Sequence, residues 1–130
     1  MRRLLICALA AMLLASCGKE EVKPEDIALQ AAKAYYDQLL AGDYNAFVEG
    51  SLKGDSVPPA YKRQLVLNMQ MFIERQNNEH KGIVSVKPMR AVADTAHHAA
   101  EAFLSITFAD SVREEVVVPM VEKNGVWYMQ

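Results

Sequence analysis

Cys17 is the residue of this chain whose type and position most clearly suit a covalent reaction. It directly follows the small residue Ser16 and an apolar run, residues 4–15, that has no polar side chain. A cysteine thiolate is a nucleophile and can take a lipid in thioether linkage. The small side chains of Ala15 and Ser16 allow the chain to enter a peptidase cleft. These residue types thus suit cleavage of the chain beside Ser16 and a covalent modification of the Cys17 thiol.

Leu14-Ala15-Ser16-Cys17 resembles the lipobox of bacterial lipoproteins. Met1-Arg2-Arg3 supplies the positive start of a secretory signal, and the apolar run is shorter than the about 20 residues that a membrane-spanning helix needs. The resemblance implies a lipoprotein signal peptide over residues 1–16 and a lipidated Cys17 with its tether over residues 17–24. Two or more acyl chains, palmitate among them, hold a protein stably on a bilayer, so the membrane is the first expected partner.

The residues after Cys17 bear on the location. Residues 18–23 can span at most about 20 Å, so the domain must sit close to its bilayer. No Asp follows Cys17, and the inner-membrane retention signal of many double-membraned bacteria is therefore absent. Lys19-Glu20-Glu21 resembles a surface-export tag of some bacterial groups, with an ordinary charged linker as the alternative. We expect a lipid-anchored protein of the bacterial cell envelope, on the outer membrane, at its periplasmic side or at the cell surface.

Few side chains in the rest of the chain have types and positions suited to catalysis. Tyr35 and Tyr61 fall on helix faces predicted to point inward, where a tyrosine packs with its hydroxyl at the rim. Glu114 is predicted on the core side of a strand, and a catalytic carboxylate there needs burial or a charge partner to tune its pKa. His97 and His98 are adjacent, so on a strand they would point to opposite faces. We expect them to be solvated loop residues rather than joint metal ligands.

The sequence carries no recognisable motif for cofactor or nucleophilic chemistry. It has no Gly-rich phosphate loop, no nucleophile elbow and no CxxC pair. His80 stands near the predicted end of a helix, where a cation is favourable. We therefore predict no catalytic residue, no metal site and no cofactor, and we expect that the domain is not an enzyme.

Composition indicates one domain over residues 25–130. The chain has 14 Lys and Arg against 16 Asp and Glu, and loss of Arg2 and Arg3 with the signal peptide makes the balance more acidic. There is no basic run, which argues against nucleic acid as a partner. Cys7 lies in the segment expected to be removed, so the mature chain has no internal disulfide and depends on its core.

The hydrophobic period predicts helices first and strands afterwards. Pro24 suits a first helical position, Gly42 a left-handed helix end and Asp43 an N-cap. From Gly82 the pattern changes to strands, and Pro88 makes the first of them an edge or bulged strand. The expected helices cover residues 24–41, 44–52 and 59–77, and the expected strands cover residues 83–92, 99–108, 112–121 and 126–130.

Asn124-Gly125 is a strong hairpin signal and helps to define the register of the sheet. We expect Leu104 opposite Val116 and Met120 opposite Met129, with Trp127 on the same core side. The expected fold class is α+β, with N-terminal helices packed on a curved antiparallel four-stranded meander. The opposite face of the sheet is then expected to carry an apolar patch with a polar rim, made of Phe103, Val117, Val121 and Tyr128. Such a patch usually marks an interface.

Two stretches carry a further resemblance. Ala31-Ala32-Lys33-Ala34-Tyr35-Tyr36 leads into Gly42-Asp43-Tyr44, and Asn124-Gly125-Val126-Trp127 follows the strands. They resemble the nuclear-transport-factor-2-like (cystatin-like) superfamily, and within it small bacterial lipoproteins with a domain of unknown function. The resemblance implies a cone of helices and sheet that binds ligands, hosts catalysis or is filled in. The candidate lining residues are Tyr35, Tyr61, Glu114 and Trp127.

Two functions from different classes follow. The first and preferred one is a non-catalytic envelope lipoprotein whose domain binds a protein partner or a small ligand. A second copy packed on the outer patch, as domains of the resembling fold often do, and another envelope protein are alternative partners. The second function is a small isomerase-like or cyclase-like enzyme that uses the cone. A cavity with an acid or a His opposite Tyr35 favours the enzyme, and a filled cone favours binding.

Overall fold

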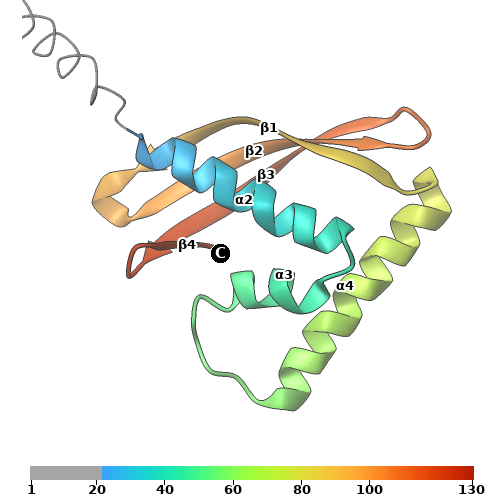
Figure 1. Cartoon of the computed structure of the whole chain (residues 1–130), viewed down its shortest axis with the longest axis horizontal. Coiled ribbons are helices and arrows are strands. Elements are labelled where there is room, and N and C mark those ends of the chain that lie inside the picture. The colour runs from blue at the N-terminus through green and yellow to red at the C-terminus, as the bar shows by residue number, and fades with distance from the viewer. Residues whose placement is uncertain (1–21) are drawn as a thin grey trace, which may run out of the picture.

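The computed structural model describes residues 22–130. The expected signal peptide, Cys17 and most of the tether lie outside the described residues. Within them, three helices precede a four-stranded sheet (Figure 1). The helices are α2 (Pro24–Leu40), α3 (Tyr44–Ser51) and α4 (Pro59–His80), and the strands are β1 (Ile83–Asp94), β2 (Ala99–Phe108), β3 (Arg113–Lys123) and β4 (Val126–Met129), with a 3-10 turn, η1 (Thr95–His97), between β1 and β2.

The helix boundaries follow the local chemistry of the sequence. Pro24 occupies the first turn of α2, and Gly42 adopts a positive φ of 84° just beyond its end. The Asp43 carboxylate caps α3 by accepting a hydrogen bond from the Ala46 amide at 3.1 Å. α4 continues to His80, three residues later than expected, and Lys81 ends it in a left-handed conformation.

The sheet is an antiparallel meander in the order β1-β2-β3-β4, which confirms the expected α+β class. Leu104 pairs with Val116, and Met120 pairs with Met129, as the alternation and the Asn-Gly turn predicted. A register shift between Pro88 and Arg90 confirms that Pro88 marks a bulge in an edge strand. The amide of Gln130 donates to the carbonyl of Pro119 at 2.9 Å, so the pairing continues just beyond the end of β4.

The hydrophobic core lies between α2 and one face of the sheet. Every second residue of β2, from Ala100 to Phe108, is buried, and the core side of β3 and β4 contributes Val118, Met120, Trp127 and Met129. Alanines on α2 let the helix approach closely: Ala28 and Ala32 have no exposed surface. The small residues that mark the first helix in the sequence thus serve tight helix-on-sheet packing.

Helix α4 differs from its expected position. The face that was predicted to point inward, on which Tyr61 lies, is at most half-buried, and no residue of α4 is fully buried. The helix packs on α3 and on the start of β1, and it diverges from the sheet along the rest of its length (Figure 1). The apolar period thus predicted the side of the helix that faces the protein, whereas the extent of burial depends on the angle at which α4 leaves the sheet.

Candidate functional site

The interior of the cone is filled by apolar side chains. Leu104 and Met120 have no exposed surface, and Trp127 and Met129 are buried beside them. Among residues 22–130, no polar or charged residue is buried. The fully buried core of residues 22–130 therefore holds apolar packing and no titratable side chain.

Tyr35 holds α2 to the last hairpin. Its hydroxyl donates a hydrogen bond to the backbone carbonyl oxygen of Trp127 at 2.7 Å. Partial burial, and to a smaller degree Tyr128, raises the pKa of the Tyr35 phenol above its ordinary value, so the hydroxyl remains protonated and donates. Tyr35 and Trp127 line a shallow groove of about 340 Å³ between α2 and the β3–β4 turn, and the residues that line it include neither an acid nor a histidine.

The other two expected cavity residues lie on the surface. Tyr61, predicted on a core stripe, is 53% exposed because the first turns of α4 lie away from the sheet. Glu114 pairs with Ile106 as predicted, but its side chain is exposed because it stands at the start of β3, next to the β2–β3 turn. The structure thus brings Tyr35 and Trp127 together and leaves Tyr61 and Glu114 apart from them.

His80 and Asp110 form a pair that the sequence did not suggest. His80 ends α4, Asp110 lies in the β2–β3 turn, and Nδ1 of the histidine is 2.8 Å from the carboxylate oxygen Oδ2. This hydrogen bond raises the pKa of His80 and lowers the pKa of Asp110, and partial burial opposes both shifts. The imidazole also packs on the ring of Phe108, with 4.6 Å between the centroids. The pair fastens the end of α4 to the sheet.

The adjacent histidines are solvated turn residues, as expected. His97 and His98 are both exposed at the η1 turn, where Nδ1 of His97 lies 2.7 Å from an Asp94 carboxylate oxygen. His98 faces Glu122 instead, at 3.3 Å, so the two rings have separate partners. Within residues 22–130, no three His, Cys, Asp or Glu side chains are placed to hold a metal ion together.

The outer face of the sheet carries the expected apolar side chains, but part of the patch is covered. Val117 is exposed at its centre, opposite Phe103. The guanidinium carbon of Arg90 lies 3.9 Å from the centre of the Phe103 ring, and an Arg90 nitrogen reaches Glu115 at 3.1 Å. A cation over an aromatic face is favourable and shields the ring from water.

The end of this patch at β4 is also shielded. Val121 and Tyr128 are half-buried, and Gly54 from the loop after α3 lies beside the Tyr128 hydroxyl. Lys123 on β3 reaches Asp55 of the same loop at 3.0 Å. The loop therefore covers the β4 edge, which leaves Val117 as the open centre of the outer patch.

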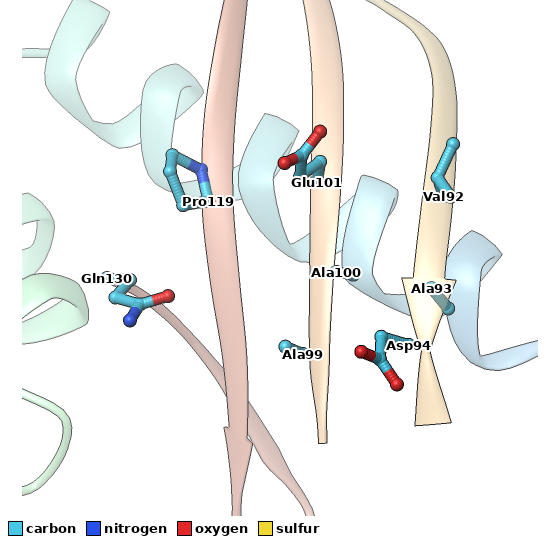
Figure 2. A pocket seen from close by; sticks show the side chains of 8 residues that line it. All are labelled: Val92, Ala93, Asp94, Ala99, Ala100, Glu101, Pro119 and Gln130. Carbon is cyan, nitrogen blue, oxygen red and sulfur yellow. The ribbon is translucent and has the colours of Figure 1, made fainter. Parts of the chain in front are cut away.

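A groove of about 360 Å³ adjoins the outer patch (Figure 2). Small residues such as Ala99 form its floor, and Val92 and Pro119 stand at its sides. Figure 2 shows the carboxylates of Asp94 and Glu101 at this groove, with α2 behind the strands. The groove is thus on the solvent face of the sheet and offers an apolar floor beside two acidic groups.

Comparison with known proteins supports the fold alone. No family model matches the chain, and no curated protein matches its sequence. The structure is similar to the crystal structure of a "putative NTF2-like transpeptidase" from Campylobacter jejuni, with a TM-score of 0.53 and 13% sequence identity, covering 75% of this chain and 92% of that one. In the part of the chain that the structure describes, no helix has the length and hydropathy of a membrane span. The expected fold is confirmed: the domain has an α+β fold, three helices followed by a four-stranded antiparallel sheet, that is similar to the fold of this NTF2-like protein.

Proposed function

We propose that this protein is a lipid-anchored lipoprotein of the bacterial cell envelope whose domain binds a protein partner and does not catalyse a reaction. The observation that carries the proposal is the filled interior, in which Leu104, Met120, Trp127 and Met129 occupy the space that a ligand or a substrate would need. The isomerase or cyclase alternative and an enclosed small-ligand site both require an open cone. Neither an acid nor a histidine lies in the groove that Tyr35 lines.

The partner surface of this proposal is the outer face of the sheet. Val117 forms its open apolar centre, and the groove with Asp94 and Glu101 continues from it. An apolar centre with a charged rim is the usual composition of a protein interface. We expect a partner segment with an apolar side chain against Val117 and a basic side chain near Glu101. The occupant is a second copy of the domain or another envelope protein.

Site-specific photo-crosslinking in native membranes tests this surface. A photoreactive phenylalanine analogue at Val117 should give a discrete adduct, whereas the same analogue at Ile27, an equally exposed apolar residue on α2, should not. The mass of the adduct separates a second copy from another protein. Equal or absent adduct formation at the two positions would contradict a partner on the outer face.

The anchor has a separate test, because residue 17 lies outside the described residues. Metabolic labelling with a palmitate analogue should mark the wild-type protein, and Cys17→Ser should abolish both the label and the retention in the membrane fraction. The matched control Ser51→Ala changes a residue inside the domain and should keep both. An unlabelled protein with an intact N-terminus would show that the lipobox resemblance is misleading.

The side of the membrane has its own test. If Lys19-Glu20-Glu21 is a surface-export tag, protease added to intact cells should remove the domain, and replacement of the three residues by Ala should protect it. Protection of the wild-type protein would place the domain on the periplasmic side.

A further inference from the structure

Helix α4 has an apolar surface that the rest of the described chain does not cover. None of its 22 residues is buried, whereas the shorter α2 buries four. Leu67 and Met71, one turn apart on its outward side, are 46% and 51% exposed. Figure 1 shows α4 at the border of the molecule, away from the start of α2. A helix with clustered exposed apolar residues at its centre is a candidate interface.

The charges on the same side of α4 are of opposite sign at its two ends. At about 100° per residue, Arg63, Leu67 and Glu74 fall within about 40° of one another around the helix axis. Arg63 and Glu74 are both exposed, and neither forms an ion pair with another residue of 22–130. The face thus carries a cation, an apolar centre and an anion in sequence.

This order of charges is complementary to itself when two helices run antiparallel. With a two-fold axis between Leu67 and Gln70, Arg63 of each copy lies opposite Glu74 of the other, which forms the same ion pair twice. The same axis brings Met71 of each copy beside Leu67 of the other, because these two residues lie on the same side of the helix face. A two-fold axis makes both contacts isologous, which is the commonest symmetry of soluble homodimers.

The surface beside α4 is also hollowed, with Leu67 at the edge of the hollow. A groove of about 540 Å³ follows the first half of the helix, between it and Asn45 at the start of α3. Val66 and Leu67 form its apolar part, with Lys62 and Arg63 at its polar margin. The unbranched methionine side chain fits irregular apolar hollows well. Met71 of one copy therefore packs on Leu67 at the edge of this groove in the other copy, and the reverse contact forms at the same time.

We propose that α4 binds a second copy of this chain, with the two α4 helices antiparallel, Arg63 paired with Glu74 across the interface and Met71 packed against Leu67. This surface is separate from the outer face of the sheet and does not rest on the function proposed for it. A single helix pair is smaller than a standard interface of about 1,600 Å², so we expect a reversible dimer. A covalent trap is the suitable measurement for such a dimer.

Disulfide crosslinking of the full chain in native membranes tests the proposal. Gln70→Cys places a thiol next to the two-fold axis, where the two α-carbons can approach within the about 7 Å that a disulfide allows. Mild oxidation should give a covalent dimer. Glu79→Cys, on the same helix but distant from the axis, is the matched control, and the chain without an added cysteine measures any contribution from Cys17. Equal crosslinking of the two variants would overturn the proposal.

Charge exchange then tests the pairing itself. In the Gln70→Cys background, Arg63→Glu or Glu74→Arg places like charges opposite each other and should lower the crosslinking yield about fivefold. The double variant Arg63→Glu/Glu74→Arg restores opposite charges and should restore the yield. Loss of the fold in a single variant would not be repaired in this way. A double variant that crosslinks no better than the single ones would overturn the antiparallel arrangement.

Discussion

Replacement of Trp127 by alanine tests how the last hairpin closes the core. The side chain is 5% exposed, next to buried Met120 and Met129, and α2 is fastened to it through the Tyr35 hydroxyl. A tryptophan buries about 150–250 Å², which at about 25 cal/mol per Å² corresponds to about 4–6 kcal/mol. Large aromatic-to-alanine changes in cores cost about 3–5 kcal/mol. We therefore expect Trp127→Ala to lower the free energy of unfolding by about 3–5 kcal/mol, a large share of the about 5–15 kcal/mol of a small domain.

The measurement is a urea titration of the full chain followed by far-ultraviolet circular dichroism, because the variant lacks the single tryptophan of the sequence. The melting temperature should fall by at least about 12 °C. Val126→Ala is the matched control, since Val126 precedes Trp127 in β4 but is exposed. If Trp127→Ala lowers the urea midpoint no more than Val126→Ala does, the tryptophan does not close the core and the reasoning is wrong.

Two other predictions concern helix contacts. In Gly50→Ala, the new Cβ would overlap the ring of Tyr35, so we expect a loss of about 1–3 kcal/mol in urea titrations. Gly42→Ala, where the Cβ meets nothing, measures instead the cost of a positive φ, which Gly50 does not have. The hydrogen bond between His80 and Asp110 raises the pKa of His80 and lowers that of Asp110. The pair should therefore contribute its full stability at pH values below the ordinary histidine pKa of about 6.5, as long as Asp110 stays ionised. This stability should be lost as pH rises through the folded pKa of His80, or falls through that of Asp110. The urea midpoint of Asp110→Asn should not vary with pH in this way. Equal pH profiles of the variant and the wild-type protein would contradict the prediction.

Much of the fold could be predicted because its signals are local. Asp43 caps α3, Pro88 marks a bulge and Asn124-Gly125 forms the last turn, each through the backbone chemistry of one or two residues. The register of the sheet followed from the same cause, since a shift by one residue would move Leu104 and Met120 from the core to solvent. The same argument predicted that Trp127 lies on the core face of the sheet, and its burial confirms this.

The surface features could not be predicted in this way. The sequence placed Tyr61 on a core stripe, but a helical period gives only a direction around the axis and no angle between helix and sheet. Likewise, the cover over Phe103 depends on Arg90 of the neighbouring strand, and the His80–Asp110 pair joins residues 30 positions apart. No local pattern reports such contacts.

What the sequence determined by itself is the order of the elements, the register of the sheet and the identity of its core face, because these depend on backbone preferences and on alternation within one segment. The tertiary structure decided that the cone is filled, that the loop after α3 covers one end of the outer patch, and that α4 remains uncovered. These properties depend on the distances and angles between elements. The energy of burial is set by the neighbours that each side chain meets, and only the packed chain specifies which neighbours these are.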